Sequence, residues 1–280
     1  MITINDITIV IVIYNSSELI FDCLKKLRNF KKIIVDNGKN SHIIDKLKKE
    51  ENISIVSQNR NLGFGNAVNF AFNFIKSKYF LVLNPDIIID EKTILKLLLT
   101  ISKYENCAIS APISVSEVDS YGILPERRKL FLNKDKETAK IEPEGEFCVD
   151  VANGCALLIN SKLFKEVDCF SPEYFLFWEE VDLCRKFYNK KYSVIINSNA
   201  LAYHNQGKSS RQSLKNFFIR EFYSELSPLY YFKIKKRDIS IYKKMGKYLF
   251  RSITYLIILN FKNSIKNLAK MFANISYLIK

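Results

Sequence analysis

The first half of the chain alternates short apolar runs with segments whose apolar residues recur at helical spacing. Apolar runs typical of buried strands cover residues 7–13, 32–35, 53–56, 79–83 and 107–111. Helical spacing covers residues 16–28, 43–49, 65–76 and 93–104, and Asp90 is the candidate cap of the last helix. Strands that alternate with helices predict an α/β fold with a parallel, doubly wound sheet.

The pattern changes after residue 111. Residues 112–148 are polar, with scattered Pro and Gly and many charges, and predict a long loop or insertion that could close over a site. The stretch "VANGCALLINSKLFKEV" predicts a strand and then a helix capped by Ser161. A helix over residues 178–190 and a strand over 192–196 complete the predicted α/β part.

Charge is concentrated in the last quarter of the chain. The formal net charge is +14, and residues 211–280 carry fifteen Lys and Arg against three acids, a net +12, which leaves +2 for residues 1–210. We therefore separate an α/β domain, residues 1–210, from a basic helical tail, residues 211–280. A nucleic-acid surface would explain a basic segment, but a nearly balanced body argues against it. A membrane-surface segment is the favoured interpretation.

The tail alternates aromatic and aliphatic residues with Lys and Arg after Pro228. The apolar run between Arg251 and Lys262 is far shorter than the roughly 20 residues of a spanning helix. We therefore expect an amphipathic basic helix at an anionic membrane surface. Packing against the α/β domain, or a homo-oligomer contact, is the alternative.

The cysteine and histidine residues indicate the cellular compartment of the protein. The six cysteines form no CxxC pair and no zinc-type cluster, and the only histidines are His42 and His204. No signal peptide is visible at the N-terminus. We expect a reduced, cytoplasmic protein with mostly buried thiols, peripheral on the inner face of the cell membrane.

Three polar clusters follow predicted strands. They are Tyr14-Asn15-Ser16, Asp36-Asn37-Gly38 and Asn84-Pro85-Asp86. Each alone has the composition of a turn. Because the carboxyl ends of parallel strands share one edge of a sheet, the three together predict a ligand-binding crevice.

Two further segments carry candidate chemistry. In "QNRNLGFGNAVNFAF", Gly63 and Gly65 would let backbone approach a ligand, and the helix N-terminus favours an anion; the alternative is a loop with a helix cap. In "FLFWEEVDLCRK", Glu179 and Glu180 follow an aromatic run that should pack against something and lower the local dielectric. A carboxylate there could serve as a general base. The alternative is a solvated helix start, with Asp182 paired to Lys186.

His204 is the last candidate residue. A lone histidine is more often structural than a ligand, but this one follows a strand-like segment, "ALAYH". Its imidazole could supply nitrogen to a divalent ion beside Asp86.

Six motifs of the chain, and the order in which they occur, resemble those of the family-2 inverting glycosyltransferases of the GT-A fold. The resemblance is closest to bacterial rhamnosyltransferase-like members. The motifs run over residues 6–207: "IVIVIYNS", "IIVDNG", "NRNLGFGNAVN", "LVLNPD", "NGCALLINSKLFKEVDCFSPEYFLFWEEVDLCRK" and "AYHNQGKSS". The fold implied is a Rossmann-like nucleotide-diphospho-sugar transferase with a C-terminal helical extension.

The resemblance implies roles for individual residues. The nucleotide-sugar pocket would include Tyr14, Asn15, Asp36, Asn59, Asn61, Gly63, Asn66, Asn84 and Asp86. Asn84-Pro85-Asp86 matches the family's variant of Asp-x-Asp, so Asp86 would contact Mg²⁺ or Mn²⁺ with His204 as second ligand. The family often shows Glu-Asp where this chain has Glu179-Glu180, so the base that the resemblance implies would be Glu180 or Glu179.

The implied reaction is a single inverting displacement. The donor would be dTDP-rhamnose, and the acceptor a growing bacterial surface polysaccharide or a lipid-linked glycan of the cell envelope. A UDP-sugar such as UDP-galactofuranose or a UDP-hexose is the alternative donor. Outside catalysis, the alternatives are an inactive sugar-nucleotide-binding homologue and a nucleic-acid-binding protein.

Overall fold

The computed structural model describes residues 3–16, 18–38, 40–115, 121–122, 143–204, 213–233 and 239–279. The chain divides into two compact units. We call Met1–Ser171 with Glu180–Arg211 the sheet unit, and Pro172–Glu179 with Gln212–Lys280 the helical unit.

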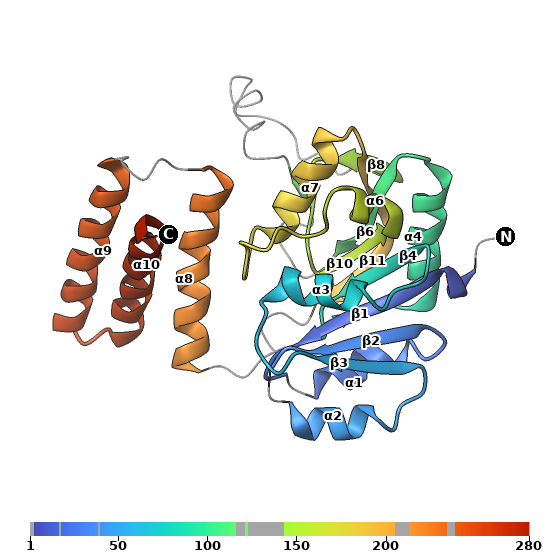
Figure 1. The fold of residues 1–280 in the computed structure, drawn as a ribbon, viewed down its shortest axis with the longest axis horizontal. Helices are drawn as coiled ribbons and strands as arrows, with labels where there is room; N and C mark the ends of the chain where they lie inside the picture. The colour runs from blue at the N-terminus through green and yellow to red at the C-terminus, as the bar shows by residue number, and fades with distance from the viewer. Residues whose placement is uncertain are drawn as a thin grey trace. The chain divides into compact units, whose positions relative to one another are not determined.

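The sheet unit is built on one large sheet (Figure 1). Its strands in the described residues are β1 (Ile7–Ile13), β2 (Lys31–Asp36), β3 (Ile53–Ser57), β4 (Tyr79–Leu83), β5 (Ile87–Ile88), β6 (Cys107–Ser114), β8 (Glu146–Val149), β10 (Ala156–Asn160) and β11 (Ser193–His204). They are ordered β3-β2-β1-β4-β10-β6-β11-β5, and β8 pairs with β11. A separate short pair joins β7 (Tyr121–Gly122) to β9 (Val151–Ala152).

Helices cover both faces of this sheet. The described helices are η1 (Ile4–Asp6), α1 (Leu19–Lys25), α2 (Ser41–Leu47), α3 (Phe64–Phe72), α4 (Glu91–Lys103), α6 (Ser161–Glu166) and α7 (Glu179–Asn189). Apolar residues of α1, α2 and α4 share one core with Ile9 and Ile11 of β1. Those of α3, α6 and α7 share another with Val10 and Val12. Alternate residues of β1 therefore enter opposite cores, as the strand's apolar sequence predicts.

The predicted sheet direction holds for only part of the sheet. The four strands β3, β2, β1 and β4 are parallel, but β10 runs antiparallel to both β4 and β6. Because β10 is antiparallel to both of its neighbours, β6 has the same direction as β4, and β11 is parallel to β6. The wholly parallel prediction is therefore wrong at β10, which lies between two strands of the opposite direction.

The predicted loop over residues 112–148 is wrong at both ends. The structure continues β6 to Ser114 and places Glu146–Cys148 in β8, because the long strand β11 pairs with both. Residues 116–120 and 123–142, the middle of that prediction, lie outside the described residues.

One of the two predicted caps is confirmed. Asp90 accepts a hydrogen bond from the amide of Thr93 at the start of α4. The cap of α6, however, is Asn160, whose Oδ1 accepts from the amides of Lys162 and Leu163. Ser161 is instead the first helical residue, and its hydroxyl donates to the carbonyl of Ser77. Asn160 therefore satisfies the free amides of the first helical turn from one position before the predicted cap, Ser161.

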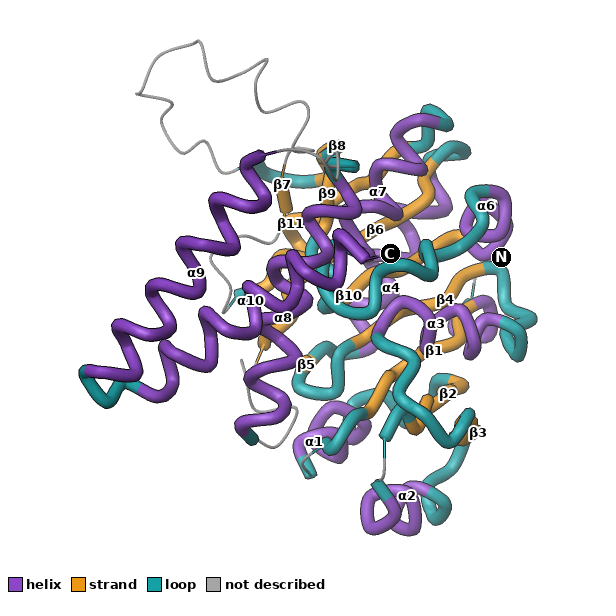
Figure 2. Tube along the Cα trace, turned by 60° about the vertical axis from the view of Figure 1, so that its left-hand side comes forward, coloured by secondary structure: helices purple, strands orange, loops and turns teal. Residues whose placement is uncertain are grey.

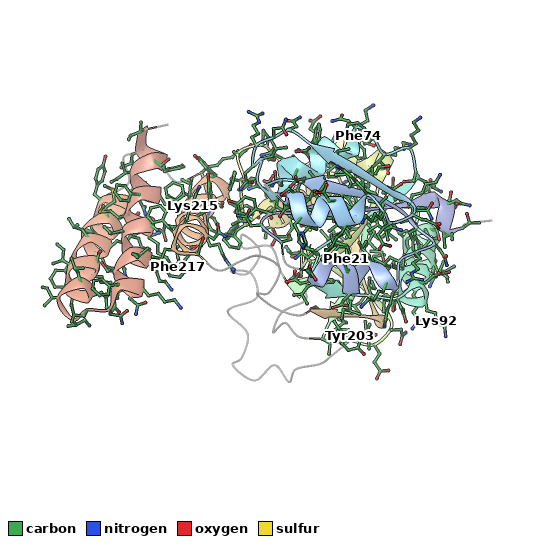
Figure 3. All side chains as sticks on the ribbon, turned by 90° about the horizontal axis from the view of Figure 1, so that it is seen from below. Phe21, Phe74, Lys92, Tyr203, Lys215 and Phe217 are labelled. Atoms are coloured by element: carbon green, nitrogen blue, oxygen red, sulfur yellow. The ribbon has the colours of Figure 1, made fainter. Side chains whose placement is uncertain are left out.

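The helical unit contains the helices α8 (Leu214–Tyr231), α9 (Ile239–Ile257) and α10 (Phe261–Ile279), and α10 packs against both others (Figure 2). Its core comprises Leu226, Leu229, Ile241, Ala273 and Tyr277. Figure 3 labels Lys215 and Phe217 on α8, and the ammonium of Lys262 lies 5.6 Å from the centre of the Phe217 ring. The tail is thus a packed bundle, so part of its apolar surface is covered by its own helices.

Two acids of α8 hold the bundle together electrostatically. Glu221 lies 3.8 and 3.7 Å from the ammonium groups of Lys266 and Lys270 on α10. Glu225 accepts a 2.8 Å hydrogen bond from Tyr248 on α9 and one of 3.3 Å from Asn274 on α10. None of the helices in the described ranges is long and apolar enough to cross a bilayer.

Candidate functional site

Three polar strand ends meet at one edge of the sheet. In the parallel register, Ile13 of β1 pairs with Asp36 of β2, and Ile11 pairs with Leu83 of β4. Tyr14 and Asn84, the next residues of their chains, therefore follow at the same edge. The sequence prediction that these clusters converge is confirmed for the backbone.

Asp36 is fixed by its neighbours in the first half of this edge. Its Oδ1 accepts hydrogen bonds from Asn40 Nδ2 at 2.6 Å and from the Gly38 amide at 3.2 Å. Asn40 Oδ1 in turn accepts from the Ser16 amide at 2.9 Å. A Cβ on Gly38 would lie 3.0 Å from Tyr14 Cδ2, so the loops of β1 and β2 approach too closely for a side chain there.

Asn37 ties the glycine-rich segment to β2. It is 4% exposed, and its Oδ1 accepts from the Leu62 amide at 2.7 Å. Its Nδ2 donates to Asn61 Oδ1 at 2.9 Å and to the carbonyl of Gly63 at 3.1 Å. Gly63 has φ of 80°, which favours glycine, and precedes α3. The backbone leading into α3 is therefore held rigidly beside the strand ends.

The remaining predicted residues of this segment are placed differently. Asn66, in the first turn of α3, donates from Nδ2 to the carbonyl of Leu62 at 3.2 Å. Asn59 is exposed and has φ of 57°, as does Asn15 at the β1 end with φ of 48°. Asparagine tolerates this left-handed conformation better than most residues, which explains its use at both sharp turns.

Asp86 is buried at the end of β4, with 4% of its surface exposed. The turn before it is closed by the amide of Ile87, which donates to the carbonyl of Asn84 at 3.2 Å. Burial raises the pKa of the Cys23 thiol on α1 to about 12, and the charge of Asp86 adds to that shift. The Asp86 carboxylate is therefore near enough to the Cys23 thiol to interact with it electrostatically.

The backbone of β11 brings His204 next to Asp86 in the sheet. His204 pairs with Ile87 across the antiparallel β5–β11 ladder. This pairing places the two backbones side by side, and the binding of a divalent ion by Asp86 and His204 stays a prediction. Within the described ranges, no group of three or more His, Cys, Asp or Glu side chains is placed to hold a metal by itself.

Glu180 lies over the turn that precedes β10. A Cβ on Gly154 would lie 3.5 Å from Cβ and Cγ of Glu180 and 3.7 Å from its Cδ. The next residue, Cys155, accepts a hydrogen bond at its carbonyl from the Asn84 amide, at 2.9 Å. Glu180 is therefore connected through one short turn to the strand end that carries Asp86.

Glu179 and Asp182 are both buried, with 7% and 2% exposed. Glu179 is the last residue of the helical unit's first segment, whereas Glu180 begins the second segment of the sheet unit. Asp182 pairs with Arg185 and accepts from the hydroxyl of Ser171. The predicted pairing of Asp182 with Lys186 is therefore wrong.

Lys186 instead donates to the carbonyl of Cys169 at 2.8 Å. Arg185 takes the place of Lys186 at Asp182 because, like Lys186, it lies within one helical turn of that carboxylate, and its guanidinium offers several donors. Leu183 and Phe187 of the same helix have no exposed surface.

Asn40 and Gly154 of this edge were missing from the predicted site, and Asn37 was named in a polar cluster but given no role. Their signal in the sequence is the amide or glycine beside a strand end, in "VDNGKN" and "VANGCA". Such residues are common in ordinary turns, so the pattern alone does not distinguish them. The mostly buried thiols are confirmed: Cys23, Cys107, Cys155 and Cys184 are buried, and Cys148 is exposed.

The comparisons with known proteins agree with this geometry. The family model for glycosyl transferase family 2 matches residues 8–166, more than half of the chain. The chain belongs to this family. The match runs from β1 to the end of α6 and so includes the three polar strand ends; Glu179 and Glu180 lie beyond it.

Relatives and solved structures share the fold at low identity. The low-salt glycan biosynthesis hexosyltransferase Agl10 of Haloferax volcanii is 23% identical over 192 residues, 64% of this chain and 61% of that protein. GalNAc-T7 with UDP, GalNAc and Mn²⁺ has a TM-score of 0.57 at 13% identity, over 79% of this chain and 50% of that one. The mannosyltransferase PcManGT of Pyrobaculum calidifontis, with GDP-Man and Mn²⁺, has a TM-score of 0.57 at 10% identity, over 98% and 74%.

These likenesses establish the GT-A fold of glycosyltransferases for this family-2 member. The chain spans less than two thirds of the length of Agl10 and half the length of GalNAc-T7.

Proposed function

We propose that this protein is an inverting glycosyltransferase that moves a sugar from a nucleotide donor to a hydroxyl group of a glycan or lipid-linked glycan. The observation that carries the proposal is the edge where Asp36, Asp86 and Glu180 come from three parts of the chain. The reaction needs a group that binds the nucleotide, a carboxylate beside the diphosphate and a general base. Asp36, Asp86 and Glu180 are the candidates for these three roles.

The donor pocket comprises Tyr14, Asn15, Asp36 and the segment from Asn59 to Asn66. In this proposal Asp36 binds near the base of the nucleotide, and the amides before α3 lie near the sugar and diphosphate. Because Asn37 and Asn40 hold these loops in place, the pocket is organised before the donor arrives.

The donor we favour is dTDP-rhamnose, on the resemblance to rhamnosyltransferase-like proteins, with UDP-galactofuranose or a UDP-hexose as the alternative. Two structural neighbours carry UDP and GDP-mannose. Proteins with this fold therefore bind different nucleotides, and the nucleotide of the donor has to be tested on this chain.

Asp86 and His204 are proposed to hold Mg²⁺ or Mn²⁺ together with the donor diphosphate. When bound, such an ion supplies Lewis-acid stabilisation of the leaving diphosphate. Asp86 itself supplies a buried negative charge at the strand end, which sets where the diphosphate can sit. Asn84, at the start of the same turn, is proposed to orient the donor beside it.

Glu180 is proposed as the general base that accepts the proton of the attacking hydroxyl. Its contact with the Gly154 turn, next to the β4 end, supports Glu180 over Glu179. A single displacement with one base inverts the configuration of the sugar carbon. Asp182 is satisfied by Arg185 and Ser171, which supports a structural role for it.

The helical unit is proposed to bind an anionic membrane surface, where a lipid-linked acceptor would also lie. Eight large apolar residues near the α9–α10 connection are exposed: Leu249, Phe250, Ile253, Leu256, Ile257, Ile258, Leu259 and Phe261. We call them the apolar corner. Arg251 lies within this stretch and Lys262 directly follows it, and residues 239–280 contain no acid. Exposed apolar side chains among cations complement an anionic bilayer.

Wild-type protein should release nucleoside diphosphate from one donor of a panel containing dTDP-rhamnose, UDP-galactofuranose, UDP-hexoses and GDP-mannose. The measurement is coupled detection of the diphosphate with and without acceptor glycan. Release from dTDP-rhamnose supports the favoured donor, and release from a UDP-sugar alone replaces it. No release from any donor, by protein that binds one of them, would support an inactive binding protein.

Asp86→Ala should abolish transfer and weaken binding of Mn²⁺ in the presence of nucleoside diphosphate, with the fold intact by circular dichroism. The binding is followed by the paramagnetic resonance of Mn²⁺, so the readout does not depend on turnover. Asp45→Ala, which removes an exposed carboxylate on α2, is the control. Full transfer in a chelator would refute the metal requirement.

Glu180→Gln should lower kcat by about 10²- to 10⁴-fold while leaving donor affinity unchanged, because only proton transfer is lost. Glu179→Gln is measured beside it as the matched variant one position earlier. A loss confined to Glu179→Gln would move the base to that residue, and wild-type rates in both would place the base elsewhere.

Replacing Ile258 and Leu259 by Glu should reduce binding to anionic vesicles by at least about tenfold, because each inserted side chain contributes about 1.5–3 kcal/mol. The measurement is flotation with vesicles of graded phosphatidylglycerol content. Leu99→Glu, which changes an equally exposed leucine of α4, should leave binding unchanged. Wild-type binding indifferent to salt and lipid charge would contradict the proposal, and a concentration-dependent dimer lost in the variant would identify a second copy as the occupant.

A further inference from the structure

The segment that leads out of α6 has an unusual backbone. Asp168 and Cys169 both have φ of 56°, the left-handed conformation that is uncommon for any residue with a side chain. Two such residues in succession raise the free energy of the folded chain and persist only where surrounding contacts enforce them. Side chains of two other helices, α3 and α7, supply these contacts.

Asn69 of α3 binds the backbone of Phe170 in both directions. Its Nδ2 donates to the carbonyl of Phe170 at 2.8 Å, and its Oδ1 accepts from the amide of the same residue at 3.0 Å. The Phe170 side chain is 1% exposed, and its ring lies 5.4 Å from that of Phe164 in the core shared by α3, α6 and α7. Phe170 is therefore fixed by its side chain and by both of its backbone polar groups.

Two side chains of α7 hold the flanking residues. The ammonium of Lys186 donates to the carbonyl of Cys169 at 2.8 Å. The carboxylate of Asp182 accepts from the hydroxyl of Ser171, which is 8% exposed. Asp182 and Lys186 are four residues apart and therefore share one face of α7. Residues 169–171, which we call the linking segment, are thus bonded to both α3 and α7.

Glu180 lies on the other side of α7. It comes two residues before Asp182, which corresponds to about 200° around the helix axis. Its side chain lies over Gly154, where an added Cβ would be 3.5 Å from Cβ and Cγ of Glu180. The helix α7 is therefore held between the linking segment and the turn at Gly154.

The start of α3 follows the proposed donor-binding segment. Asn37 accepts from the Leu62 amide at 2.7 Å and donates to the Gly63 carbonyl at 3.1 Å, so this start is tied to the end of β2. Asn69 lies in the same nine-residue helix. One short helix thus contacts the sheet edge at its start and the linking segment further along.

We infer that Asn69 is a positioning residue: through the linking segment it fixes α7, and with it Glu180, relative to the donor-binding segment before α3. Asn69 acts through the backbone of Phe170 and touches no reacting atom. The inference rests on the proposed role of Glu180, and every residue that it uses belongs to the sheet unit. It gives a role to the last asparagine of "NRNLGFGNAVN", which is absent from the predicted site.

The test is a double-mutant cycle on kcat, measured on the full chain with the donor found in the panel and a water-soluble acceptor. Asn69→Ala should lower kcat by about 10²-fold, the effect of misplacing a catalytic group by about 1 Å, with donor affinity unchanged. In the Glu180→Gln background the same substitution should change kcat less than about twofold, because a misplaced glutamine loses nothing further. Asn69→Gln, whose amide has the same donor and acceptor, should recover part of the rate.

A matched control and a second measurement separate positioning from general stability. Asn73→Ala changes an exposed asparagine at the end of α3, whose amide donates only to carbonyls of that helix, and should leave kcat unchanged. Hydrogen exchange of the α7 amides should accelerate in Asn69→Ala and keep its wild-type rate in Asn73→Ala. This readout follows the path from Asn69 to α7 without any turnover.

The outcomes separate this inference from the proposed function. Equal losses of kcat in both backgrounds, wild-type kcat in Asn69→Ala, a loss of donor affinity alone, or unchanged exchange of α7 would each overturn the inference. If Glu180→Gln keeps the wild-type rate, the base assignment fails first, and the inference falls with it. If Asn69→Ala does not fold, Lys186→Met, which keeps an apolar stem and removes the bond to Cys169, replaces it in the same cycle.

Discussion

The fold depends on how β1 is paired. This strand is buried along its whole length, and its alternate residues enter two different cores. Both faces are apolar, so side-chain alternation alone would tolerate a shift of register. The polar residues at the strand ends remove that freedom, since sliding β1 would draw Tyr14 and Asn15 into the sheet or expose isoleucines. The same residues that fix the register therefore come to lie at one edge.

That edge is built largely from amides. The loops after β1, β2 and β3 are partly buried, so their backbone groups need partners, and Asn37, Asn40 and Asn61 supply them. An asparagine side chain can donate and accept at once, which lets one residue join two loops. The asparagine-rich segment thus has a structural role that does not compete with ligand binding, because it keeps the glycine-rich backbone in one conformation.

The sequence predicted best those features that depend on residues adjacent in the chain. The bounds of β1 and β4 match the prediction because both are uninterrupted apolar runs that end at polar residues. The antiparallel direction of β10 was missed because direction depends on which strands flank it, which no local pattern reports. The choice of Arg185 over Lys186 at Asp182, and of Asn160 over Ser161 at a cap, depends on geometry within one turn. The contacts of 175–178 join residues about fifty positions apart, although the need for some packing partner was predicted.

The helix α8 holds the helical unit together through two of its faces. One of its faces, at Glu221 and Glu225, binds cations and polar groups of α9 and α10, so part of the tail's charge is used internally. A second face, at residues 223, 227 and 231, holds the segment that leads to Glu180. One helix therefore holds together both the three-helix bundle and the segment Pro172–Glu179 within the helical unit.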